Sequence, residues 1–120
     1  MKVILIADDS LISRLSLKKT IKSLPVTILE AENGAIAMEI IKNKKPDLIL
    51  LDLLMPEMDG TDILRLMKKE SINIPAIVLS ADIQETTIKE VSKLGAAAFI
   101  HKPADPVLLL AIIKKTIKVT

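Results

Sequence analysis

The stretch ILLDLLMPEMDG, residues 49–60, decides the fold. A run of Ile and Leu leads into a single aspartate, Asp52, and the chain is then interrupted at Pro56 and Gly60. A short apolar run between such breakers is typical of a buried strand, and wholly apolar strands are typical of parallel sheets covered on both faces. Because ligands of such sheets bind at the carboxyl ends of the strands, we expect Asp52 at a functional edge. From this stretch alone, a polar residue that merely ends a strand explains Asp52 equally well.

Similar apolar runs recur along the chain and alternate with segments of helical periodicity. The predicted strands cover residues 3–7, 26–31, 48–51, 76–79 and 98–100. Asp82 is a candidate cap for the fourth helix, and Asp105 followed by Pro106 starts a last helix that is expected to run to about Lys118. About five strand–helix units predict an α/β fold, a doubly wound parallel sheet with helices on both faces.

Composition limits the class of protein. The 120 residues suffice for one domain, residues 1–120, and half of them are apolar although Phe99 is the only aromatic residue. A net charge of +2, with scattered basic residues and no stacking aromatics, does not favour nucleic-acid binding. The absence of cysteine excludes disulfides and thiolate metal sites. No apolar run is long enough for a membrane span and no cleavable leader is visible, so we expect a cytoplasmic protein.

Polar side chains follow four of the predicted strands at the point where each ends. They belong to Asp8, Asp9, Asp52, Ser80 and Lys102. Because the carboxyl ends of parallel strands meet at one edge, and strands one and three are neighbours in a doubly wound sheet, the three carboxylates should converge. Unpaired carboxylates repel and raise one another's pKa, and a hard cation such as Mg²⁺ relieves this repulsion.

A carboxylate nucleophile beside Mg²⁺, a lysine and a hydroxyl is suited to phosphoryl transfer. The transition state spreads negative charge over equatorial oxygens, and catalysis consists mainly of positioning and charge neutralisation. Lys102 would supply positive charge and Ser80 one hydrogen bond, while an aspartyl phosphate on Asp52 is a known kind of covalent intermediate.

These residues resemble those of the receiver domain of two-component response regulators, the single-domain chemotaxis regulators included. The resemblance covers the whole chain and rests on Asp8-Asp9-Ser10, Asp52 with Met55-Pro56 and Met58-Asp59-Gly60, Ser80-Ala81, and Phe99 with Lys102-Pro103. It implies a flavodoxin-like sheet of five strands in the order 2-1-3-4-5; a chemotaxis member of the family is a standard example of this order.

The resemblance also implies roles for the site residues. Asp52 would accept a phosphoryl group from a phosphohistidine, on a sensor histidine kinase or a histidine phosphotransfer protein. Asp9, Asp52 and the backbone carbonyl of Leu54 would ligate Mg²⁺, with Asp8 helping, often through water. Lys102 would pair with a phosphoryl oxygen.

Further implications concern the response to phosphate. Ser80 would move toward the phosphoryl group and Phe99 would turn into the space released. The Lys102-Pro103 bond would be cis. Leu54 lies at a position that tunes phosphate lifetime in the family, and its apolar side chain predicts slow dephosphorylation.

The expected output is a change of partner binding. The protein would catalyse only its own phosphorylation and slow dephosphorylation, as part of a two-component system or phosphorelay. Its readout would be the face formed by the fourth helix, fifth strand and fifth helix, which would bind a downstream target protein or form a homodimer. Direct nucleic-acid binding and membrane insertion are not expected, and a chain that ends naturally at Thr120 would act by binding a target.

Two helices are expected to be more apolar than packing against one face of a sheet requires. Helical spacing places Leu15 opposite the buried face of the first helix, with Leu11 and Ile12 on its flanks, and this surface is a candidate docking face for the histidine donor. In the last helix, Leu108 and Ile112 oppose the buried face and are candidates for a partner or dimer face. Chance exposure in a chain rich in Ile and Leu would explain both.

Three alternatives remain open from the residues. Glu57-Met58-Asp59-Gly60-Thr61 resembles the D-x-D-G-T motif of haloacid-dehalogenase-like phosphatases, but it begins with Glu and follows the third strand instead of ending the first. A flavin-binding protein of the same topology would need a phosphate loop in place of Asp8-Asp9. A pseudo-receiver that is not phosphorylated would act as an interaction module, although the residues for the chemistry are present.

Overall fold

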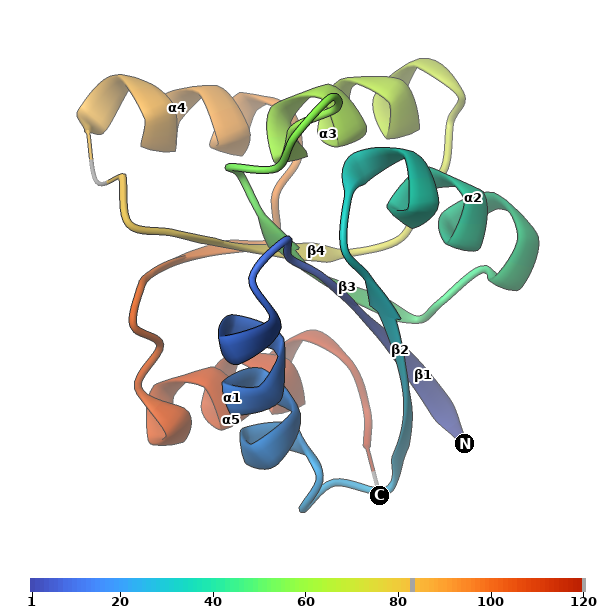
Figure 1. The fold of residues 1–120 in the computed structure, drawn as a ribbon, viewed down its shortest axis with the longest axis vertical. Helices are drawn as coiled ribbons and strands as arrows, with labels where there is room; N and C mark the ends of the chain where they lie inside the picture. The colour runs from blue at the N-terminus through green and yellow to red at the C-terminus, as the bar shows by residue number, and fades with distance from the viewer. Residues whose placement is uncertain (83, 120) are drawn as a thin grey trace.

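The computed structural model describes residues 1–82 and 84–119, in which strands and helices alternate along the chain. The sheet orders its strands as β2-β1-β3-β4-β5, and every neighbouring pair is parallel, which confirms the predicted α/β fold and strand order (Figure 1). The strands are β1 (Lys2–Ala7), β2 (Val26–Ala31), β3 (Leu48–Asp52), β4 (Ala76–Ser80) and β5 (Ala98–His101). The helices are α1 (Leu11–Ile21), α2 (Gly34–Lys44), α3 (Gly60–Lys69), α4 (Glu85–Lys93) and α5 (Pro106–Thr116).

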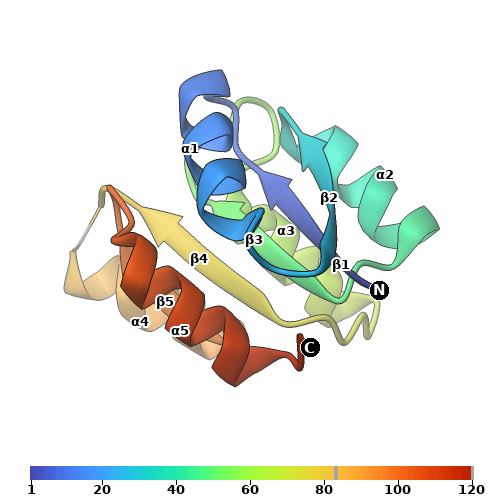
Figure 2. The ribbon, with the colours of Figure 1, turned by 90° about the horizontal axis from the view of Figure 1, so that it is seen from below.

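The sheet separates two apolar cores. Figure 2 shows α1 and α5 side by side on one face, with α2, α3 and α4 behind the sheet. Successive residues of a strand point to opposite faces, so Leu50 packs toward α1 and α5 whereas Ile49 and Leu51 pack toward the other three helices. All residues of β3 and β4 are buried, which agrees with the apolar sequence of both strands up to their last residues, Asp52 and Ser80.

Helix ends hold the loops of the functional edge in place. The Ser10 side chain caps α1 by accepting a hydrogen bond from the Ser13 N–H group. At the start of α3, Asp59 and Asp62 form a capping box in which each side chain accepts a bond from the other's backbone. These caps fix the chain where it leaves β1 and where it returns after β3.

Two predicted helix ends are wrong. Helix α4 begins at Glu85 with Gln84 as its N-cap, so Asp82 lies too far ahead to cap it; the Asp82 carboxylate instead accepts bonds from the Gln84 N–H and Thr87 hydroxyl groups. Helix α5 ends at Thr116 rather than near Lys118, because the backbone of Ile117 is already extended.

Within the described residues, no helix is long and apolar enough to cross a membrane.

Candidate functional site

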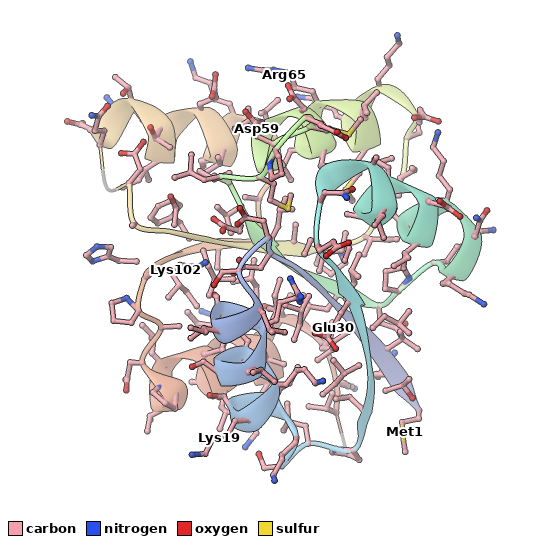
Figure 3. The ribbon with its side chains drawn as sticks, in the orientation of Figure 1. Met1, Lys19, Glu30, Asp59, Arg65 and Lys102 are labelled. Atoms are coloured by element: carbon pink, nitrogen blue, oxygen red, sulfur yellow. The ribbon has the colours of Figure 1, made fainter. Side chains whose placement is uncertain are left out.

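The side chains of Asp8, Asp52 and Lys102 meet at the carboxyl edge of the sheet. Asp8 follows β1 directly, Asp52 ends β3, and Lys102 follows β5. The Lys102 Nζ atom lies 2.6 Å from Asp8 Oδ2 and 3.2 Å from Asp52 Oδ2. Figure 3 shows the labelled Lys102 near the start of α1, although 94 residues separate it from Asp8 in the chain. The parallel strands thus assemble a charged cluster from distant segments.

Asp8 is the most strongly bound member of the cluster. Asp8 is only 1% exposed, and both of its carboxylate oxygens accept hydrogen bonds. Oδ1 accepts from the Ser10 N–H group at 2.9 Å, and Oδ2 accepts from the Ser13 hydroxyl at 2.5 Å and from Lys102. Bonding of this kind stabilises the ionised carboxylate in a position that water scarcely reaches.

Carboxylate oxygens of Asp8, Asp9 and Asp52 lie within 4.8 Å of one another. Asp9 is exposed, whereas the other two aspartates are buried. Three hard oxygen donors with an opening to solvent suit a divalent cation that keeps part of its water shell, as Mg²⁺ does. The acidic cluster could therefore hold such an ion.

The pKa values of the two buried aspartates are shifted in opposite directions: that of Asp52 is raised and that of Asp8 is lowered. Burial raises the pKa of Asp52, and the negative charge of Asp8 raises it further, while Lys102 only partly opposes both effects. Burial would also raise the pKa of Asp8, but hydrogen bonds from Lys102, Ser13 and Ser10 outweigh it and hold that pKa below its usual value. Burial lowers the pKa of Lys102, yet bonding to Asp8 and the charge of Asp52 raise it overall.

Ser80 lies next to this cluster without bonding to it through its side chain. Its hydroxyl is buried and accepts a bond from the Asp82 N–H group at 3.0 Å. Its backbone carbonyl accepts a bond from the Lys102 N–H group at 2.9 Å, which ties the chain after β5 to the end of β4. Among the hydrogen bonds of the described residues, none joins the Ser80 hydroxyl to Asp52 or Lys102.

Three other predicted residues surround the edge. Leu54 is 66% exposed, and its N–H group donates to Asp52 Oδ1 at 3.2 Å. Phe99 is half-buried and packs against the core that faces α2, α3 and α4. The Lys102-Pro103 peptide bond is cis, which confirms the expectation drawn from the resemblance.

Sequence reasoning missed Ser13 and Arg14. The Arg14 Nη1 atom donates to the Asp8 carbonyl at 2.6 Å and its Nε atom donates to Glu30 at 3.1 Å, so Arg14 joins α1 to the ends of β1 and β2. Ser13 bonds to both Asp8 and Lys102. The only available signal was the position of both residues in the first turn after the Ser10 cap, which turns them toward the strand end.

The expected apolar surfaces are only partly exposed. Leu11, Ile12 and Leu15 are exposed on α1, as predicted, and so is Leu108 on α5. The prediction for Ile112 is wrong, because this side chain is partly buried against the core beneath α1 and α5. The two helices pack on each other as well as on the sheet, which widens the covered side of α5.

The sequence and the fold of this chain are similar to those of known proteins. The family model described as "Response regulator receiver domain" matches residues 4–114. The chain belongs to this family. The chemotaxis protein CheY of Thermotoga maritima is 37% identical over 118 residues, covering 98% of each chain. The receiver domain of a putative LuxO repressor protein from Vibrio parahaemolyticus has a TM-score of 0.92 at 28% identity, covering 96% of this chain and 88% of that one.

Receiver domains also match as parts of longer proteins. The sensor histidine kinase CheAY of Helicobacter pylori is 34% identical over 120 residues, which are 97% of this chain but 15% of the kinase. Members of the family are signalling proteins rather than classical enzymes. The chain is accordingly a phosphorylation-activated switch of the two-component type.

Proposed function

We propose that Asp52 is the phosphoacceptor of this switch. The observation that supports it best is the convergence of two buried aspartates on Lys102, which lies within 3.2 Å of an oxygen of each. Asp52 alone combines a place at the end of the central strand β3 with an oxygen, Oδ1, whose bond comes from a backbone N–H group of the following loop. Asp52 is 8% exposed whereas Asp8 is 1% exposed, so Asp52 is the more accessible of the two buried aspartates to a phosphoryl donor.

The acceptor reaction needs an ionised Asp52. One Asp52 oxygen attacks the phosphorus of a phosphohistidine, the oxygen–phosphorus bond forms as the phosphorus–nitrogen bond breaks, and the imidazole nitrogen keeps the electron pair and takes up a proton. Since burial raises the pKa of Asp52, the positive charge of Lys102 serves to keep the nucleophile ionised. The same charge then lies next to the transferred group.

The acidic cluster fits Mg²⁺ by its donor chemistry, and we propose that Asp9 and Asp52 hold it, with the backbone carbonyl of Leu54 as a further ligand. Asp8 would act through water, because both of its oxygens already accept hydrogen bonds. When bound, Mg²⁺ neutralises charge on the phosphoryl oxygens.

Phosphorylation would shift the population of two conformations. A phosphoryl group adds about −2 charge and three strong acceptors. Lys102 would pair with one of these oxygens, and Ser80 would give up the bond from Asp82 to donate to another. Phe99, half-buried on the adjacent strand, would move into the space released. The face of α4, β5 and α5 would carry the change to a target protein or a second copy.

The donor is proposed to be a histidine kinase or a histidine phosphotransfer protein. The apolar surface of Leu11, Ile12 and Leu15 directly follows Asp9 and Ser10 in the chain, so a partner that docks there brings its histidine close to the cluster. We further propose that residues 1–120 form a single receiver domain that performs no chemistry beyond its own phosphorylation and slow dephosphorylation.

The phosphatase alternative loses support from the geometry of its motif. Asp59, its counterpart of a catalytic aspartate, is committed to the capping box of α3. Glu57 is exposed in the loop after β3. Neither residue lies at the end of the first strand, where that chemistry requires its nucleophile.

The test is the intact mass after incubation with acetyl phosphate and Mg²⁺, beside Asp52→Asn and a sample with chelator. One added phosphoryl group that requires both Asp52 and the metal supports the proposal. The same adduct on Asp52→Asn would assign the acceptor elsewhere. No adduct, together with no Mg²⁺ binding, would favour the pseudo-receiver that acts by binding alone.

A further inference from the structure

Lys102 makes a third contact that the phosphoryl-transfer scheme does not use. Its ammonium group has three N–H bonds, and three acceptors surround it: Asp8 Oδ2 at 2.6 Å, Ser13 Oγ at 3.1 Å and Asp52 Oδ2 at 3.2 Å. The Ser13 hydroxyl proton in turn points to Asp8 Oδ2 at 2.5 Å. Ser13, Asp8 and Lys102 therefore form a closed hydrogen-bonded triangle, with Asp52 attached at one corner.

Helix α1 fixes the position of Ser13. Ser13 is the third residue of the helix, and its N–H group is bound by the Ser10 cap, so its backbone cannot shift without breaking the helix start. Ser13 is half-buried, and its hydroxyl reaches both members of the charged pair, Asp8 and Lys102. The triangle is thus anchored to a rigid element at Ser13 and at the end of a buried strand at Asp8.

This arrangement holds Lys102 on Asp8. A divalent cation in the acidic cluster draws on the same negative charge, so Lys102 and the cation compete for it. Every bond that stabilises the pairing of Lys102 with Asp8 makes the cation-free form more stable relative to the cation-bound form.

We infer that Ser13 is a positioning residue that holds Lys102 on Asp8 and thereby weakens divalent-cation binding at the acidic cluster. The inference rests on the proposed function, since it assigns regulation to the same site. It means that the affinity for Mg²⁺ is set partly by a hydroxyl that does not ligate the metal.

A simpler account is that Ser13 is an ordinary polar residue of a solvent-facing helix turn. Ser16 and Thr20 lie on the same side of α1 and line the same groove as Ser13, a hollow of about 490 Å³ between α1 and the chain after β5. Neither of them bonds to Asp8 or Lys102 among the contacts of the described residues. Ser16 therefore provides a matched control for helix propensity and for the lining of the groove.

The test compares Ser13→Thr with Ser13→Val, because threonine and valine have nearly the same shape and differ in the hydroxyl group. Titration calorimetry with MgCl₂ suits a chain that lacks Trp and Tyr. We expect Ser13→Val to bind Mg²⁺ about three- to tenfold more tightly than Ser13→Thr, the effect of one hydrogen bond. Ser13→Thr and Ser16→Val should stay within about twofold of the parent protein. Equal affinities of the two Ser13 variants, or weaker binding by Ser13→Val, would overturn the inference.

A second measurement without metal separates this inference from the proposed function. In protein labelled with ¹⁵N-lysine, hydrogen exchange of the Lys102 ammonium group should be faster in Ser13→Val than in Ser13→Thr. Equal exchange would overturn the positioning role. If exchange depends on the hydroxyl but the parent protein takes up neither Mg²⁺ nor phosphate, the positioning of Lys102 stands and the phosphoacceptor role fails.

Discussion

The α-carbon of Gly60 packs against the backbone of Asp52. A β-carbon at Gly60 would lie 2.5 Å from the Asp52 carbonyl oxygen and 2.9 Å from the Leu53 α-carbon. The Gly60 N–H group also donates to the Leu53 carbonyl at 3.0 Å, which closes the loop between β3 and α3. Because these neighbours are backbone atoms at the end of a buried strand, they cannot move aside without moving Asp52.

Gly60→Ala should therefore disturb both stability and the site. We expect a loss of about 2–3 kcal/mol in the free energy of unfolding, the usual cost of overpacking, and slower phosphorylation by acetyl phosphate. Gly95→Ala is the control: its β-carbon would meet nothing within 4 Å, but a φ of +94° makes it strained. That variant should lose about 1 kcal/mol and keep the phosphorylation rate. Urea denaturation and intact-mass kinetics measure the two effects, and equal rates for both variants would contradict this account.

Asp52→Asn should stabilise the metal-free protein at neutral pH. Since the folded-state pKa of Asp52 is raised, its ionised form costs stability above that pKa, and the cost vanishes as pH falls below the unfolded-state value of about 3.9. We expect a gain on the order of 1 kcal/mol at pH 7 that shrinks toward pH 4. Thermal unfolding with EDTA across this range provides the comparison. A variant less stable than the parent at pH 7 would show that the bond to Lys102 outweighs the burial of charge.

Mg²⁺ should stabilise the protein through the acidic cluster. A ligand at 100 times its Kd adds about 2.7 kcal/mol to the free energy of unfolding. Asp9→Asn removes an exposed carboxylate of the cluster and should lose most of this gain, whereas Glu32→Gln, an exposed residue just after β2, should keep it. Unfolding midpoints with and without Mg²⁺ measure the difference. An equal gain in both variants would place the cation outside the cluster.

Leu54 should slow the loss of phosphate. Its exposed side chain lies two residues after Asp52, and its N–H group donates to Asp52 Oδ1, so the residue is held close to the proposed phosphorylation site. Leu54→Ala should shorten the phosphate half-life by about three- to tenfold, as expected when an apolar shield of one side chain is removed. Leu11→Ala, another exposed leucine, is the control. A parent half-life of only seconds would argue against this role.

Substitutions in the apolar surfaces of α1 and α5 should affect different functions, the first donor binding and the second binding of a target or a second copy. Leu15→Lys is expected to reduce phosphotransfer from a cognate kinase at least about tenfold, because a buried charge at an interface costs more than 1.4 kcal/mol, while leaving phosphorylation by acetyl phosphate unchanged. Leu108→Lys should spare both reactions and weaken a phosphorylation-dependent dimer or target complex. Unchanged kinase transfer in Leu15→Lys would remove α1 as the docking face.

Much of the fold follows from local pattern. The strand limits derived from sequence agree with the structure to within one residue at each end, because short, mainly apolar runs bounded by polar residues or breakers have few other ways to be buried. Asp82 and the end of α5 were misplaced because capping depends on the backbone course of a loop. The burial of Ile112 could not be predicted either, since it depends on the packing of α1 against α5.

By itself, the sequence determined the edge on which Asp8, Asp52 and Lys102 gather, because strand order and direction bring every strand end there. Only the tertiary structure decided that Lys102 lies closer to Asp8 than to Asp52, and that Ser13 completes the contact. These are differences of a few tenths of an ångström between side chains from separate elements. No spacing along the chain encodes them, because they depend on how far α1 and the end of β5 approach across the sheet.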